Sequence, residues 1–200
     1  MRLKCGLKFS AITFQYMGKN NKPQKNTGEV EVSKPKAQIM AEASRIEEST
    51  LYSSKGHFNA SHFWARYHLY IGIPLVVLSA VVGASVLAEF DPKRIIAGVL
   101  AVVITILSGL MTFLNPNQKV TAHKSSGSHY YSLMNKVRIF RTVDCWREDS
   151  EEVLTEKLKY FSEQKDKLNE TCPQIPFWAY KKAKKGIEVD GEADFAVDKK

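Results

Sequence analysis

Two stretches without a charged side chain dominate this sequence: LYIGIPLVVLSAVVGASVLA at residues 69–88 and IIAGVLAVVITILSGLMTFL at residues 95–114. As α-helices each would rise about 30 Å, at about 1.5 Å per residue, which matches the hydrocarbon thickness of a bilayer. A core helix of a soluble protein needs only one apolar face, whereas these stretches are apolar all round. The sequence therefore predicts transmembrane helices at about 69–89 and 93–114.

The connection between the two stretches is short, polar and contains a proline, residues 89–94. Such a short link makes the two helices antiparallel neighbours. Asp91 suits the N-cap of the second helix and Pro92 its first position. Lys and Arg are more numerous on the outer flanks than in this connection, which favours a cytosolic location for both termini.

The composition excludes several classes of protein. The 200 residues carry a net charge of +8, and the three cysteines show no zinc or disulfide spacing. No nucleotide-binding or hydrolase motif is present, so we expect no enzyme activity, cofactor, metal site or nucleic-acid partner. Neither apolar stretch contains a carboxylate, His or Lys, the groups on which proton-coupled transport depends.

The polar regions outside the spans predict further helices. We expect residues 1–36, which are basic, to form a largely flexible N-terminal segment without a cleavable signal peptide. Helices are expected at about 37–66, with a break near Ser53–Gly56, and at about 117–147 and 150–170. Asn115-Pro116-Asn117 predicts a bend after the second span, and Asp149 with Glu152 resembles a capping box.

Apolar side chains of the 150–170 helix predict how it packs. They recur as a seam formed by Leu154, Leu158, Phe161 and Leu168. Two heptads are compatible with a coiled coil and equally with packing against neighbouring helices of the same chain. Residues 173–200 form a tail rich in Pro, aromatic residues and Lys, which either docks on an anionic leaflet or stays solvated.

Aromatic and small residues give the spans their finer pattern. Trp64, Tyr67 and Tyr70 predict an interfacial belt at headgroup level. Thr105, Ser108, Thr112 and Asn115 share one helix face and are candidate pore-lining residues, since pore walls are often polar but uncharged. The candidate helix-packing residues are small: Ser79, Gly83, Ala84, Ala97, Ala101 and Gly109. A plainer reading is that both sets hold the two spans of one chain together.

An ordered series of short motifs carries a family resemblance. It consists of FNASHFW at residues 58–64, LYIGIP at 69–74, TFLNP at 112–116, then Ala122-His123, Gly127, Tyr130-Tyr131-Ser132-Leu133 and Val137-Arg138, and finally CPQIP at 172–176 before Ala179-Tyr180. This order resembles the SLATT domain, the two-transmembrane effector that accompanies SMODS and SLOG domains in bacterial conflict systems. The SLATT-like domain would span residues 37–172, and the resemblance itself covers roughly residues 40–185.

The resemblance implies a membrane effector that forms pores when a linked sensor detects invasion. Because the chain has no room for such a sensor, we expect a separate sensor protein. We therefore expect an all-α membrane protein that crosses a lipid bilayer as a two-helix hairpin and forms a homo-oligomeric pore or membrane-perturbing assembly. The alternative is a non-conducting membrane anchor or scaffold that recruits a cytosolic partner through its C-terminal helices.

Overall fold

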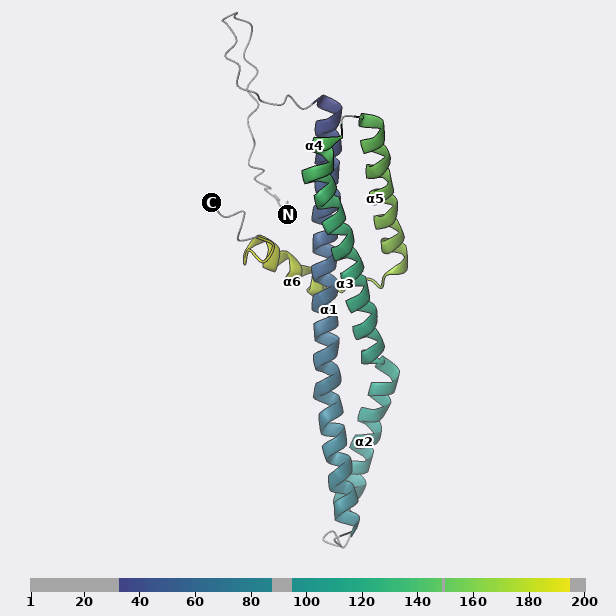
Figure 1. The fold of residues 1–200 in the computed structure, drawn as a ribbon. Helices are drawn as coiled ribbons and strands as arrows, with labels where there is room; N and C mark the ends of the chain where they lie inside the picture. Colours follow the sequence, from purple (N-terminus) through teal and green to yellow (C-terminus); the bar gives the residue numbers. More distant parts are fainter. Residues whose placement is uncertain (1–32, 88–94, 149, 195–200) are drawn as a thin grey trace, which may run out of the picture. The chain divides into compact units, whose positions relative to one another are not determined.

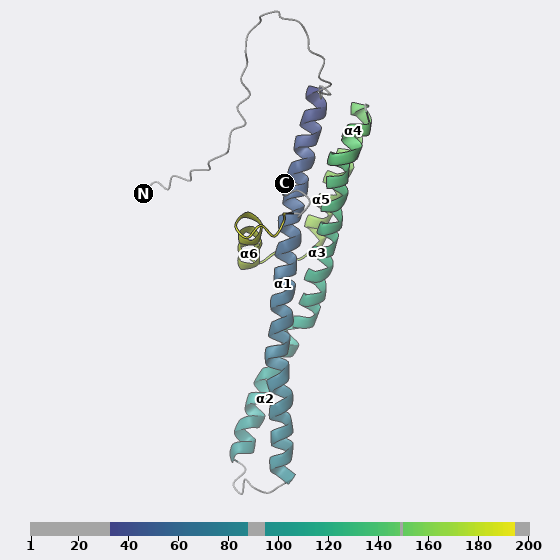
Figure 2. The same cartoon turned by 60° about the vertical axis from the view of Figure 1, so that its left-hand side comes forward.

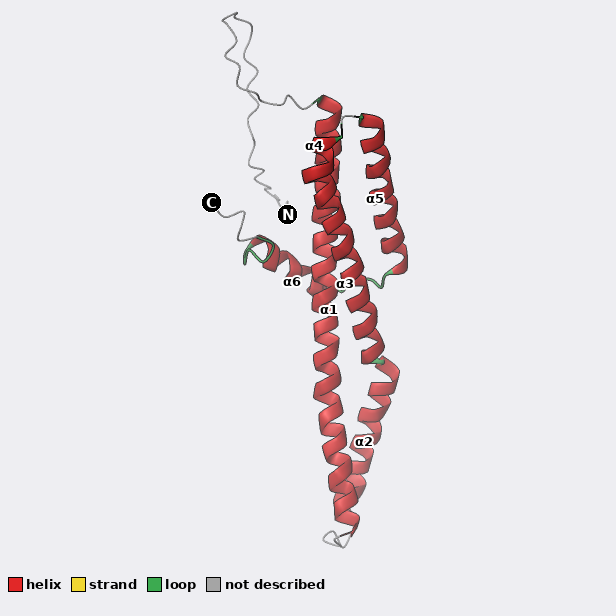
Figure 3. Cartoon of the chain, viewed as in Figure 1, coloured by secondary structure: helices red, strands yellow, loops and turns green. Residues whose placement is uncertain are grey.

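The computed structural model describes residues 33–87, 95–148 and 150–194, all within one compact unit, residues 32–200. Every element in these ranges is a helix (Figure 3), which confirms the prediction of an all-α fold. The predicted N-terminal segment overlaps the described chain only at residues 33–36, where Lys34 already starts a helix. The predicted helix start at Asp91 and Pro92 lies outside the described residues.

The longest element is α1, a single helix of 54 residues, Lys34–Leu87. At about 1.5 Å per residue it is about 80 Å long, far more than a bilayer requires. The prediction of separate helices at 37–66 and 69–89, with a break near Ser53–Gly56, is wrong because α1 continues through Lys34–Leu87 as one helix. Ser53 lies inside this helix, and its hydroxyl donates to the Ser49 carbonyl at 3.0 Å. Gly56 leaves room for the Ile175 side chain, because a Cβ at position 56 would lie 3.0 Å from it.

A sharp bend separates α2, Ile95–Leu114, from α3, Pro116–Ile139. Asn115 adopts the left-handed conformation, with φ 41° and ψ 59°, and its side chain accepts a hydrogen bond from the Gln118 amide at 3.4 Å. Pro116 follows at the first helical position, where its missing N–H costs nothing. The bend predicted at Asn115-Pro116-Asn117 is confirmed.

The C-terminal third is also helical. After α3 the chain continues through a π-helical turn η1, Phe140–Asp144, and the short α4, Cys145–Arg147. Helix α5, Glu151–Thr171, begins with Ser150 as its N-cap, so the cap predicted at Asp149 is displaced by one residue. The predicted tail contains a further helix, α6, Phe177–Glu188.

The other helices of this compact unit lie along α1, the longest of them (Figure 1). Helix α2 lies antiparallel beside the C-terminal part of α1, and α3 continues along its N-terminal part, as both views show (Figure 2). We call the α1–α2 part the membrane half, and the part where α3 and α5 pack on α1 the distal half. Two helices of the described chain are long and apolar enough to cross a membrane, and their apolar windows are only 6% and 0% buried.

The hydrophobic core lies entirely in the distal half. Its buried residues come from α1, α3, η1, α4 and α5: Ile39, Ala43, Ile46, Leu133, Val137, Phe140, Cys145 and Leu154. Leu158, Phe161 and Leu168 pack against it, partly buried. The predicted apolar seam of α5 therefore packs on helices of its own chain, which is the second of the two alternatives that the sequence allowed.

Candidate functional site

The two helices of the membrane half meet along a regular seam. Its members are the partly or fully buried residues that recur at alternating spacings of three and four: Ile71, Leu75, Leu78, Val82 and Ser85 on α1, and Ala97, Leu100, Ile104, Leu107, Met111 and Leu114 on α2. This is the knobs-into-holes spacing of neighbouring helices. The seam is built mainly of Leu, Ile, Val and Met, and it defines which way every other side chain of the pair faces.

One outer face of the pair is made of small and hydroxyl-bearing residues. The positions that follow the seam are Gly72, Val76, Ser79 and Gly83 on α1, and Gly98, Ala101, Thr105, Ser108, Thr112 and Asn115 on α2. All but the partly buried Gly72 are exposed. In an antiparallel pair the two helices wind in opposite senses when viewed from one end, so positions following the seam share one side. We call this side the small-polar face.

The opposite side has a different chemistry. The residues that precede the seam are Tyr70, Pro74, Val77, Val81 and Ala84 on α1, and Val99, Val103, Ile106, Leu110 and Phe113 on α2. Most are large and apolar, and Phe113 is 87% exposed. We call this side the bulky face. Aliphatic side chains suit lipid tails, whereas small residues allow the close approach of another helix.

Three hydroxyls of the small-polar face are bonded to carbonyl oxygens of their own helices. Thr105 donates to the Ala101 carbonyl at 2.8 Å, Thr112 to Ser108 at 3.0 Å, and Ser79 to Leu75 at 2.7 Å. Their protons are thus satisfied without water, which a bilayer interior does not supply. Their oxygens keep lone pairs that can accept a bond from water or from a neighbouring helix.

The predicted helix-packing residues take little part in contacts within the chain. Only Ala97 lies on the seam, while Ser79, Gly83, Ala84, Ala101 and Gly109 are exposed. A Cβ built at Gly83 or Gly109 would meet nothing within 4 Å. The seam, rather than these residues, holds the two spans of one chain together. Their role in packing stays a prediction, and it now concerns contacts between chains.

The predicted interfacial aromatics lie where α1 passes from the distal half to the membrane half. Trp64 and Tyr67 are partly buried in a cluster with Phe63 and Trp178, and Tyr70 is 76% exposed. The Lys119 ammonium lies 4.1 Å from the centre of the Trp64 ring, a cation–π contact. Trp178 was missed as a member of this cluster, because it lies more than a hundred residues further along the chain.

A set of buried polar contacts between α1 and α3, also missed by the sequence analysis, lies next to this cluster. His57 and His123 face each other with 2.9 Å between their Nδ1 atoms, and Tyr130 stacks on His57 at 5.4 Å between ring centres. Burial, helped by the neighbouring His123, lowers the pKa of His57 to about 4. Burial and Lys119 lower the pKa of His123 as well. Both rings are therefore neutral at pH 7, so a single ring proton can join them.

The backbones of α1 and α3 also approach each other closely here. Ser54 donates to the Gly127 carbonyl at 2.9 Å and Ser61 to the Val120 carbonyl at 3.2 Å. A Cβ on Gly127 would meet the Phe58 ring at 3.0 Å, so only glycine fits there without displacing that ring. No group of three or more potential metal ligands occurs among the described residues, and the two imidazoles act as a structural pair.

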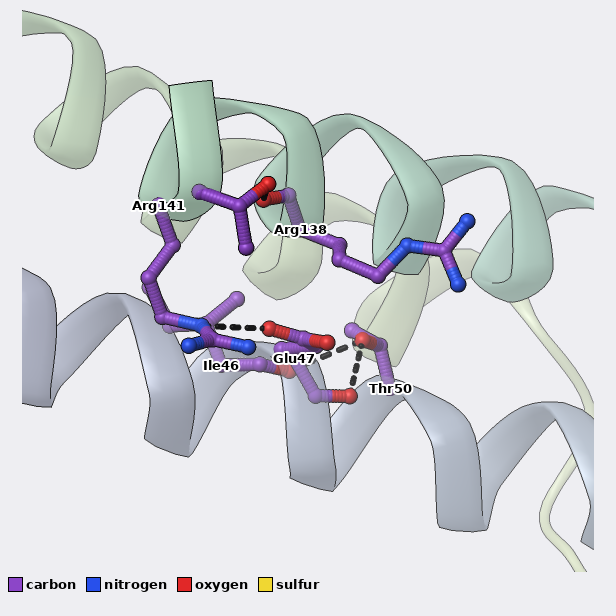
Figure 4. A network of polar contacts seen from close by, with 6 residues as sticks. Ile46, Glu47, Thr50, Arg138 and Arg141 are labelled. Atoms are coloured by element: carbon purple, nitrogen blue, oxygen red, sulfur yellow. Dashed lines mark hydrogen bonds and ion pairs between the residues drawn. The ribbon is translucent and has the colours of Figure 1, made fainter. Parts of the chain in front are cut away.

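An ion pair links α1 to η1 further from the membrane half (Figure 4). The Arg141 guanidinium donates from Nε to Glu47 at 2.8 Å. Beside it the buried Thr50 hydroxyl lies within hydrogen-bonding distance of the carbonyl oxygens of Ile46 and Glu47, at 2.8 and 2.9 Å. The ion pair fastens η1 to α1.

A groove runs between the N-terminal end of α1 and helix α5. It has a volume of about 910 Å³, and Ile39 and Leu158 contribute apolar surface to it. Its carboxylates are those of Glu42, Glu151, Glu152 and Glu156. Arg45 and Lys159 also line the groove, which therefore combines apolar surface with charges of both signs.

Comparison with known proteins agrees with this geometry. The family model described as SMODS and SLOG-associating 2TM effector domain family 4 matches residues 37–199. No curated protein and no solved structure matches the chain. The match includes α1, both candidate spans and all of the helices that follow them.

Proposed function

Because the chain belongs to family 4 of the SMODS and SLOG-associating two-transmembrane effector domains, we propose that its copies assemble into a pore or membrane-perturbing structure. The response is of the conflict or cell-death type, and a separate sensor protein triggers it. Both termini lie in the cytosol, as the excess of Lys and Arg outside the spans favours.

The observation that carries this proposal is the difference between the two outer faces of the membrane half. One chain leaves Thr105, Ser108 and Thr112 exposed on the small-polar face, and lipid is a poor partner for them. In a ring of copies the bulky face contacts lipid, while the small-polar face turns toward neighbouring copies and the central path. Asn115 sits at the cytosolic mouth of that path.

The test compares ion flux through liposomes that carry the purified protein with its mass in detergent. The triple variant T105V/S108V/T112V removes three hydroxyls, with almost no change of shape at the two threonines, and should alter conductance while the assembly keeps its mass. The matched control V99T/V103T adds hydroxyls to the bulky face and should leave conductance unchanged. Unaltered conductance in a correctly assembled triple variant would contradict the lining assignment.

A scaffold remains a second candidate, and the groove between α1 and α5 favours it. Its lining, apolar with charges of both signs, would bind a cytosolic partner whether or not the protein conducts. Tight liposomes around a monomer or dimer would support the scaffold. Flux from a multimer would support the pore, and tight liposomes around a large ring would indicate a closed pore that awaits its trigger.

A further inference from the structure

We propose that α6 is an interfacial helix that presents Trp178, Lys182 and Lys185 to anionic lipid headgroups beside the point where α1 enters the membrane. This goes beyond the proposed function, because a pore and a scaffold would both use it.

A row of small residues fixes the seat of α6. Ala179, Ala183 and Gly186 are its buried residues, and α6 packs against α1. The Asn59 side chain on α1 donates to the Ala179 carbonyl at 3.3 Å. Figure 1 shows α6 crossing α1 steeply rather than running along it. The helix therefore has two distinct flanks, one toward each end of α1.

Two aromatic contacts identify the flanks. The Trp178 ring lies 4.9 Å from that of Phe63, while the Tyr180 ring lies 6.2 Å from that of Tyr52. Phe63 comes eleven residues after Tyr52 in α1, which places it about 16 Å closer to the membrane half. The flank with Trp178 therefore faces the membrane, and the flank with Tyr180 faces away from it.

The lysines of α6 divide between these flanks. Lys182 and Lys185 follow Trp178 by four and seven residues, so they share its flank. Lys184 follows Tyr180 by four residues, and it pairs with Glu188 at 3.8 Å. Glu188 in turn accepts a hydrogen bond from Tyr52, and Glu192 is held by Lys55 at 2.8 Å. Glu188 thus belongs to the outer flank, whereas Glu192 is held by Lys55 on α1 and also lies close enough to Lys182 for their charges to interact.

The depth of the membrane-facing flank suits headgroup contact. Phe63 precedes the uncharged stretch, which begins at Leu69, by six residues, or about 9 Å of helix. The headgroup layer occupies about 5–7 Å on each side of the hydrocarbon, so Trp178 lies near its outer edge. Lysine stems extend further and keep their ammonium groups in water. Phe177, the first residue of α6, is 80% exposed.

Charge complementarity commits this surface to an anionic partner. Residues 49–88 of the chain contain no Asp or Glu, and neither do residues 95–143. The basic residues Arg66 and Lys119, which flank the two spans, lie in these acid-free stretches. Anionic lipids attract basic residues near the surface by about fivefold in affinity per residue.

The experiment measures amide hydrogen exchange of residues 177–188 in the full chain, reconstituted in nanodiscs. One lipid is phosphatidylcholine alone, and the other also contains phosphatidylserine. Two lysines at about fivefold each predict up to about 25-fold slower exchange in the anionic lipid. The variant K182Q/K185Q should lose that difference, whereas K181Q/K184Q, with the same change in net charge, should keep it. Added salt should weaken the effect.

Three results would overturn the proposal. The first is equal exchange in both lipids for the unmodified protein, and the second is an equal loss in the two double variants. The third is the same protection from inorganic phosphate in phosphatidylcholine nanodiscs, which would assign a free anion instead of a membrane surface. Unchanged exchange around His57 verifies folding. Since nanodiscs hold no ion gradient, the outcome is independent of whether the protein conducts.

Discussion

One helix, α1, passes through two very different environments in this molecule. In the distal half it is covered by α3 and α5, and its contacts include a closed core, a histidine pair and serine-to-carbonyl bonds. In the membrane half its partner among the described elements is α2, which has no fully buried residue. The distal half has a closed core within one chain, whereas the side chains of the membrane half are mostly exposed.

The largest expected effect separates the two halves with the same substitution. Phe140→Ala removes a side chain that is 1% exposed in the core and should cost about 3–5 kcal/mol of unfolding free energy. Phe113→Ala removes the same atoms from the bulky face and should leave the unfolding of the distal half unchanged. Denaturant unfolding in mild detergent, followed through the distal helices, measures both. Equal losses would contradict the division into halves.

A pH dependence confined to the distal half is the next largest effect. The pKa of His57 is about 4 in the fold against 6.5 ordinarily, so between these values the unfolded chain binds more protons. Stability is therefore full above pH 6.5 and falls as the pH drops toward 4, by up to about 3 kcal/mol. His57→Gln should flatten that part of the thermal-stability curve.

The matched control for this effect is His129→Gln, which changes an exposed histidine of α3. It should preserve the pH dependence between 4 and 6.5. If His57→Gln keeps the full slope while His129→Gln loses it, the buried pair is not the group that titrates.

What could be predicted from the sequence follows the same division. The spans and the bend at Asn115-Pro116 were predictable because uncharged length, proline and a capping Asn act locally. The continuity of α1 was missed because Gly56, a typical break signal, serves here to admit Ile175. His57 and His123 are 66 residues apart, and nothing in one sequence pairs them.

The candidate site was only half predictable for a related reason. The polar row of α2 is visible as a helical spacing, but its side of the pair depends on the register of the seam. That register becomes known only when the buried positions are known. For α6, the Pro and Lys content indicated a tail, and the overlooked signal was the spacing of Ala179, Ala183 and Gly186, which form one face.

The smallest effect on a single chain, and the sharpest test of the membrane half, comes from enlarging the small-polar face. Gly98→Leu with Ala101→Leu fills exposed positions, and a Cβ on Gly98 meets nothing within 4 Å. The fold should therefore tolerate the change, since Leu also favours a helix over Gly by about 1 kcal/mol. Close approach of another copy should fail, and the mass in detergent should fall.

The paired control, V99L/V103L, adds bulk to the bulky face. Because lipid tails adapt to added methylene groups, its mass in detergent and its unfolding should match those of the unmodified protein. An assembly that survives G98L/A101L but dissociates in V99L/V103L would show that copies meet through the bulky face. The small-polar face would then have to face lipid, and the hydroxyls of Thr105, Ser108 and Thr112 would serve only their own helix.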